Sequence, residues 1–309
     1  MIPGAAGKGP RRRSRLWAAA EDGFIIVAVL WILGALATLA TVYALYASNT
    51  ALASRVNDDR LQTEALITAA LELTAYRVTP VDLPGRPSHG RFSFSLGRAA
   101  VEAGFISEAA RIDLNMAPKE ELAGLFAALG VQVSDAAYCA DRIVAWRTRN
   151  QEADQEEEAA AYRVAGLSYK PRRAPFQSTS ELWLVMGLPA RLVEHVLPYV
   201  TVFSGSQVID VADASPIAIA AQPGMTPGKL EGVLDRRAGA AGSAPSGRAP
   251  GAQPAPVAPP EARKTMRVGV AIRFDDGRQV RAEVVILLAK DDEEPYRVLS
   301  WHDDFDGPG

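Results

Sequence analysis

The residues from Phe24 to Ala47 form a long apolar run that contains no charged side chain. As a helix, this run would be about 36 Å long, enough to cross the roughly 30 Å hydrocarbon core of a bilayer with some tilt. A helix of a soluble core seldom stays apolar on all sides over such a length. The sequence therefore predicts a transmembrane helix over residues 24–48, to which the rest of the fold is attached.

The charges that flank this run predict its orientation. The N-terminal side is strongly basic, whereas the charges on the other side balance; they are Lys8, Arg11, Arg12, Arg13 and Arg15 before the run, and Arg55, Asp58, Asp59 and Arg60 after it. The positive-inside rule then keeps the N-terminus in the cytoplasm and exports the chain that follows.

Three fates are open to the apolar run. It could remain as an uncleaved anchor, or it could be a secretory signal that is cleaved behind the small residues Ala51-Leu52-Ala53. The run is longer than the roughly 7–15 residues of a signal core. The third fate is cleavage in front of the run, after Gly23, which leaves Phe24 as the first residue of the mature chain.

The third fate matches a known pattern. A basic leader over residues 1–23, then Gly23, Phe24 and a long apolar helix resembles a type IV prepilin. The resemblance implies cleavage after Gly23 by a prepilin peptidase and N-methylation of Phe24. Most pilins carry glutamate as the fifth mature residue, where it pairs with the terminal amine of a neighbouring subunit. Here that residue is Ala28, and a subunit without the glutamate suits the end of a filament.

The helix is predicted to continue beyond the membrane as a stalk. Apolar and small residues recur every three or four positions up to Thr79-Pro80, where proline ends a helix; they are Leu52, Val56, Thr63, Ile67, Ala70, Thr74 and Val78. A membrane helix followed by a separate coil is the alternative. Two short strands, "RFSFSLG" and "AAVEAGFIS", are expected next, so that residues 49–110 hold the stalk and the first strands.

Residues 111–237 predict a compact helical domain. Three helix–glycine–helix units follow one another, with Asn115 as the expected N-cap of the first. The motif Ile112-Asp113-Leu114 returns as Ile209-Asp210-Val211. Such pairs resemble helix-hairpin-helix units, which often grip DNA phosphates, but they are also simple packing units. The turns lack Gly-x-Gly and no lysines cluster beside them, so packing is favoured over nucleic-acid binding.

An acidic stretch, "EADQEEEAAAY", interrupts this helical region. It can be the solvated start of a helix. It can also be an oxygen-rich calcium site, because calcium takes several hard oxygen ligands. The candidate ligands are Asp154, Glu156, Glu157 and Glu158, although their spacing is not that of an EF-hand. No pattern in the chain requires a cofactor, and calcium is the one candidate.

The C-terminal part returns to strands. Residues 238–264 are rich in proline, alanine and glycine and predict a linker. Residues 265–309 predict a hairpin that turns at Asp276-Gly277, and then a last strand, "YRVLSWHDDF". The expected fold is α+β: the stalk helix packs on a small antiparallel sheet, as in pilins, and a large all-α domain is inserted into that sheet.

The remaining composition sets limits on function. The chain has 309 residues, of which 48% are hydrophobic, and a net charge of −3, which gives no electrostatic case for a polyanion partner. The single cysteine, Cys139, lies in a helix-like stretch and is expected to be a buried small hydrophobe. His89, His195 and His302 are scattered, and no enzyme signature is present.

Taken in order, several segments resemble protein K of the type II (general) secretion pathway, a minor pseudopilin family. They are Gly23-Phe24 with Ala28, "RIDLNMAPKEEL", "STSELWLVMGLP", "LPYVTVFSG", "IDVADASP" and "YRVLSW". The resemblance implies a bacterial inner-membrane protein with a periplasmic domain. It also implies a place at the pseudopilus tip with the I and J minor pseudopilins, a role in starting assembly, contact with the major pseudopilin, and calcium in the α-domain.

Two other functions remain open at this point. One is a minor pilin of a type IV pilus. The other is a membrane-anchored DNA-uptake protein that uses the hairpin units; a steep salt dependence of DNA binding would favour it.

Overall fold

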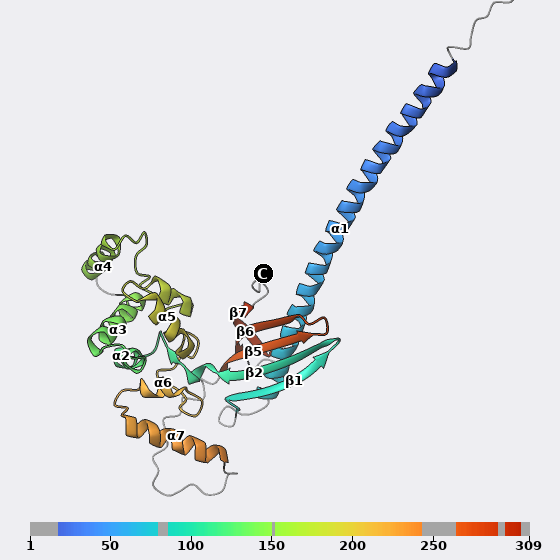
Figure 1. The fold of residues 1–309 in the computed structure, drawn as a ribbon. Helices are drawn as coiled ribbons and strands as arrows, with labels where there is room; N and C mark the ends of the chain where they lie inside the picture. The colour runs from blue at the N-terminus through green and yellow to red at the C-terminus, as the bar shows by residue number, and fades with distance from the viewer. Residues whose placement is uncertain (1–17, 80–85, 150–151, 243–263, 290–293, 304–309) are drawn as a thin grey trace, which may run out of the picture. The chain divides into compact units, whose positions relative to one another are not determined.

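The computed structural model describes residues 18–79, 86–149, 152–242, 264–289 and 294–303. The chain divides into two compact units, with the boundary in the sequence between Gln62 and Thr63. The first unit contains the N-terminal part of the long helix α1 (Ala18–Val78). The second unit contains the end of α1, a sheet and a set of short helices (Figure 1).

The end of α1 packs on the sheet through one face. Its buried residues are spaced by three or four positions, as the sequence predicts; they are Thr63, Leu66, Ile67, Ala70, Leu71, Thr74, Ala75 and Val78. The helix ends at Val78, just before the predicted stop at Thr79-Pro80. Leu52 was expected on the same apolar face, but it is exposed, because the residues of α1 that pack on the sheet begin only at Thr63.

Five antiparallel strands form the sheet, in the order β1-β2-β5-β6-β7. They are β1 (His89–Leu96), β2 (Ala99–Ser107), β5 (Thr265–Phe274), β6 (Gln279–Leu288) and β7 (Tyr296–Asp303). The predicted hairpin is formed by β5 and β6, and its buried residues alternate along each strand; they are Val268, Val270 and Ile272 of β5, and Val280, Ala282, Val284 and Ile286 of β6. Gly277 has φ 89°, which its turn requires and which glycine adopts without strain.

The helical domain is inserted between β2 and β5, which are nevertheless neighbours in the sheet. We call this domain, residues 108–242, the insert. Its elements in chain order are η2 (Glu108–Ala110), β3 (Ile112–Asp113), α2 (Lys119–Ala128), α3 (Val133–Arg147), α4 (Glu152–Val164), η3 (Thr179–Leu184), α5 (Ala190–Val196), η4 (Leu197–Tyr199), β4 (Val200–Thr201), α6 (Pro216–Ala220) and α7 (Pro227–Gly242).

Three helix–glycine–helix units are present in the insert, as predicted. The turn glycines Gly130, Gly187 and Gly224 have φ 87°, 89° and 72° and separate α2 from α3, η3 from α5, and α6 from α7. The first helix of the second unit, η3, is a 3₁₀ helix rather than an α-helix. The last helix, α7, continues to Gly242, beyond the predicted helical end at residue 237.

One cap was predicted wrongly. Asn115 does not cap α2, whose N-cap is Pro118, without a side-chain hydrogen bond. The Asn115 amide instead donates to the carbonyl of Phe176 at 2.9 Å and accepts from its N–H at 2.7 Å. It thereby ties the start of the insert to a loop far along the chain. Cys139 is buried in the core of the insert, as predicted.

Candidate assembly segment and domain junction

The N-terminal part of α1 is the first candidate segment. Among the described residues, α1 is the one helix that is long and apolar enough to cross a membrane, and its most apolar window is fully uncovered. Three threonine hydroxyl groups form hydrogen bonds within the helix. Those of Thr38, Thr41 and Thr50 donate to the carbonyl four residues earlier, at 2.5, 2.8 and 2.9 Å. Because these hydroxyl groups have hydrogen-bond partners inside the helix, the segment meets the requirement of a lipid environment that polar groups be paired within the protein.

The predicted processing site lies within α1. The helix begins at Ala18, so Gly23 and Phe24 are successive helical residues, with the Phe24 ring exposed. Ala28 follows one turn later, is half-buried and adds no charge to the apolar surface. The basic residues of the predicted leader, up to Arg15, lie outside the described residues. Cleavage after Gly23, methylation of Phe24 and the role of Ala28 remain predictions.

The acidic stretch forms helix α4, but one of the four proposed calcium ligands has another partner. The carboxylate of Glu158 pairs with Arg142 at 2.6 Å and with Arg173. A carboxylate held between two guanidinium groups does not fit a cation ligand, because both of its oxygens already accept charged hydrogen bonds. Glu156 is exposed, and the side chains of Asp154 and Glu157 lie outside the described residues. Calcium binding through these last three residues remains a prediction.

Two buried carboxylates accept hydrogen bonds from backbone N–H groups inside the insert. Asp113 is 2% exposed and accepts three hydrogen bonds: from the N–H of Asn115 at 2.8 Å, from the Ser204 hydroxyl at 3.0 Å and from the N–H of Gly205 at 2.8 Å. Asp210, its counterpart in the repeated motif, accepts from the N–H of Ala212 at 3.2 Å. Both residues thus bind the backbone two positions on, which explains why the motif Ile-Asp-hydrophobic occurs twice.

The end of this repeat is also the same in both copies. The N–H of Ala117 donates to the carbonyl of Asp113 at 2.8 Å, and the N–H of Ala214 donates to that of Asp210 at 2.9 Å. In each copy, a helix starts shortly afterwards, α2 in the first and α6 in the second. The sequence repeat is therefore a repeated turn that directs a helix into the core.

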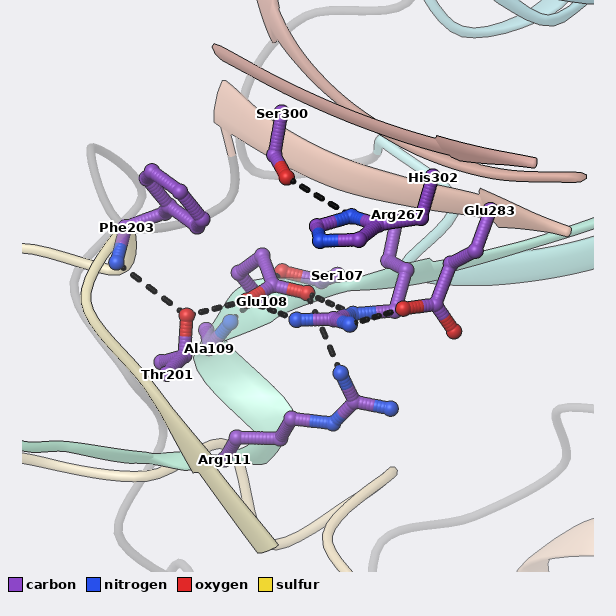
Figure 2. Close-up of polar contacts among 10 residues, drawn as sticks. All are labelled: Ser107, Glu108, Ala109, Arg111, Thr201, Phe203, Arg267, Glu283, Ser300 and His302. Atoms are coloured by element: carbon purple, nitrogen blue, oxygen red, sulfur yellow. Dashed lines mark hydrogen bonds and ion pairs between the residues drawn. The ribbon is translucent and has the colours of Figure 1, made fainter. Parts of the chain in front are cut away.

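The junction between sheet and insert is built around Glu108, which is fully buried (Figure 2). Its carboxylate accepts two hydrogen bonds from Arg267 of β5, from Nε at 2.6 Å and from Nη2 at 3.1 Å. It also accepts from Arg111, at 3.5 Å, and from the hydroxyl of Thr201 on β4. The carboxylate of η2, the hydroxyl of β4 and the guanidinium of β5 thus converge on one point. Sequence reasoning missed this network because these three elements are far apart in the chain.

The charges at this junction balance. Arg267 also pairs with Glu283 of β6, so that two guanidinium groups face two carboxylates. Burial by itself lowers the pKa of Arg267, but the hydrogen bonds and charges of Glu108 and Glu283 outweigh burial and raise it. Burial, and then the charge of Arg267, lower the pKa of Arg111. The network has the paired and hydrogen-bonded geometry that a buried charge requires.

A second contact joins the sheet to the insert. The ring Nδ1 of His89, on β1, lies 2.6 Å from the Asp213 carboxylate, whose side chain is buried. The backbone N–H of Asp210 also donates to the carbonyl of Ala109 at 2.6 Å, next to Glu108. The repeated Asp210 turn is therefore fixed to the same end of the sheet as the Glu108 network.

Comparison with known proteins gives one family match and one structural match. Residues 106–205 match the family model of protein K of the type II secretion system. The fold is similar to GspK in the crystal structure of the GspK–GspI–GspJ complex from the enterotoxigenic Escherichia coli type 2 secretion system. The two chains are 16% identical, with a TM-score of 0.58, and the alignment covers 81% of this chain and 98% of that one.

Together, these findings support a type II secretion system protein K. They also support a minor pseudopilin, and the family is a structural component of a secretion system rather than a known enzyme family. The segment that matches protein K begins at Ile106 on β2 and ends at Gly205, and thus contains both Glu108 and Asp113. No curated protein sequence matches the chain.

Proposed function

We propose that this chain sits at the tip of the type II secretion pseudopilus, where it helps to start pseudopilus assembly and so supports protein export across the outer membrane. The observation that carries the proposal is Ala28, an uncharged residue at the fifth position of the predicted mature chain. A glutamate there is costly in a membrane unless a partner amine neutralises it. A shaft subunit finds that amine on a neighbour, whereas a terminal subunit has no such neighbour.

The same proposal places the chain in the inner membrane. The apolar surface of α1 supports a single membrane span, and the basic residues before it support a cytoplasmic N-terminus. The sheet and the insert then lie in the periplasm. The partners proposed there are the I and J minor pseudopilins, as in the complex that contains the structural relative, and the major pseudopilin. Copurification of the full chain with these partners from detergent extracts tests this part.

Filament counting tests the tip assignment. In cells that overproduce the major pseudopilin, deletion of this protein should reduce the number of filaments more than their length. Ala28→Glu should not improve assembly and should lower the filament number, because its charge has no partner. Ala28→Leu is the matched control, since it keeps the position apolar and should preserve the count. An unchanged filament number after deletion, with Ala28→Glu incorporated along the shaft, would show that the tip assignment is wrong.

Processing by prepilin peptidase is part of the same proposal. The mature chain should begin with N-methylated Phe24, and Gly23→Leu should leave the leader attached because the residue before the cut must be small. N-terminal sequencing and mass spectrometry of the purified chain check both points. A mature protein that begins at Met1 or at Ser54 would instead identify an anchor or an ordinary signal peptide.

Calcium can be tested separately from the tip role. If the remaining acidic residues of α4 bind the ion in the native state alone, a chelator should lower the melting temperature by mass action. Identical melting curves with and without chelator, at matched ionic strength, would remove calcium from the description and leave the tip proposal intact.

A further inference from the structure

A basic hollow opens on the insert beside α4. It has a volume of about 700 Å³, and its lining contains five cationic side chains and one acidic one; the lining residues are Arg149, Glu156, Ala159, Arg163, Lys170, Pro171, Arg172, Arg173 and Ala174. The side chains of residues 152–155 and 157, on the neighbouring part of α4, lie outside the described residues. Hollows of this size are common ligand sites, and this one carries an excess of positive charge within the described residues.

The loop that supplies most of these cations is held in a defined conformation. Arg173 has φ 59°, in the left-handed region that a residue with a side chain seldom adopts. Its N–H donates to the carbonyl of Trp146 at 2.8 Å, and the neighbouring Pro171 is buried. Such a conformation persists only when its surroundings fix it. The loop therefore presents its charges at set positions.

Two guanidinium groups that line the hollow already pair with carboxylates of the chain. Arg173 and Arg142 share the carboxylate of Glu158, and Arg172 pairs with Glu181 at 2.8 Å.

Three more cations line the hollow. Arg149, Arg163 and Lys170 are exposed and form no ion pair with another residue in the described part of the chain. They surround an opening that is also lined by Ala159, Pro171 and Ala174. An extended segment with several carboxylates could therefore bind across the hollow, because separate side-chain cations can each take one carboxylate.

We propose that the basic hollow beside α4 binds an acidic segment of a protein partner through its carboxylates. A protein is favoured over a phosphate compound because the arginines here already pair with glutamates, through side chains. The proposal does not depend on the tip role of the chain, since it rests on the charge and shape of the insert.

The test uses the full chain in a neutral detergent and a fluorescently labelled poly-glutamate peptide, with binding followed by anisotropy. The double variant Arg163→Gln, Lys170→Gln should bind the peptide about tenfold more weakly, because exposed charge pairs contribute up to about 1 kcal/mol each. The double variant Arg236→Gln, Arg297→Gln removes the same charge from exposed residues elsewhere and should bind like the unchanged chain. Melting curves should be the same for all three.

The probes also separate the classes of ligand. A poly-glutamine peptide of the same length should not bind, and inorganic phosphate should displace poly-glutamate only at high concentration. If poly-glutamate fails to bind, or binds both double variants equally, the proposal is wrong. Tight binding of phosphate with no binding of the peptide would also overturn it and would assign the hollow to phosphate compounds.

Discussion

The core beneath the sheet and the core of the insert bury different kinds of polar side chain. In α1 and β5, the buried polar side chains are threonines, Thr63, Thr74 and Thr265, whereas the insert buries the carboxylates of Asp113, Glu121 and Asp210. The sheet core needs only a correct alternation of apolar residues. The insert consists of short helices and loops, so its backbone groups depend on side-chain partners. Stability in the insert should therefore be concentrated in a few polar residues.

Glu108 should have the largest effect, because it belongs to both regions. Glu108→Ala removes the fully buried carboxylate that two partly buried guanidinium groups share, and breaking such a network costs roughly 3–5 kcal/mol. Glu283→Ala is the matched control: it removes a carboxylate from the same Arg267, but that side chain is 49% exposed. The control should cost less than about 1 kcal/mol. Chemical denaturation of the full chain in detergent measures both.

Equal losses from the two variants would show that the Glu108 network does not stabilise the junction. Hydrogen exchange adds the location of the effect. Amides of β5 and of β4 should both exchange faster in Glu108→Ala, because the carboxylate bonds to Arg267 and to Thr201. An effect restricted to one of these strands would mean that the two regions are independent at this point.

Asp113 allows the insert to be tested without the sheet, because all of its hydrogen-bond partners lie in the insert. Asp113→Ala leaves the N–H groups of Asn115 and Gly205 without their acceptor, and we expect a loss of roughly 3 kcal/mol. Asp276→Ala is the control in the sheet, where the same kind of bond, to the N–H of Arg278 at 2.9 Å, is exposed. It should cost under about 1 kcal/mol.

Hydrogen exchange again gives the decisive measurement for Asp113→Ala. Exchange should accelerate in α2 and β4 and stay unchanged in β5 and β6. Faster exchange across the whole sheet would contradict the view that the insert loses stability without the sheet.

The difference between the two cores also explains how much of each region the sequence predicts. Periodicity placed the sheet and the buried face of α1, because residues such as Ile67 and Val284 reach the core through local geometry alone. The glycines between apolar helical segments also predicted the three turns of the insert. The pairing of Glu108 with Arg267, and of Asn115 with Phe176, joins residues that only the folded chain brings together. The fate of Glu158 belongs to the same class, because a glutamate in an acidic run gives no sign that two distant arginines bind it.

Gly124 tests the packing of the insert rather than its polar bonds. A methyl group added there would overlap the carbonyl oxygen of Ala221, at the contact between α2 and α6. Backbone cannot yield easily, so Gly124→Ala should cost about 1–3 kcal/mol. Gly232→Ala, on α7, meets nothing within 4 Å and should be neutral or gain up to about 1 kcal/mol. Denaturation midpoints compare the two, and equal midpoints would mean that α2 and α6 can move apart freely.

The smallest effect concerns the edge of the sheet, where Tyr296 of β7 faces the end of α1. Burial, and then the charge and hydrogen bond of Glu72, raise the pKa of Tyr296 to about 12. The folded state therefore holds this phenol proton more tightly than the unfolded state does, and its contribution to stability is complete below the ordinary pKa of about 10. That contribution is lost as the pH rises through the folded value. Glu72→Gln should shift the ultraviolet titration of Tyr296 toward lower pH, because it removes the neighbouring charge. Tyr296→Phe, which has no proton to lose, should abolish this part of the alkaline loss of stability. A titration unchanged by Glu72→Gln would show that the carboxylate does not act on β7, and that only burial holds this strand's phenol neutral.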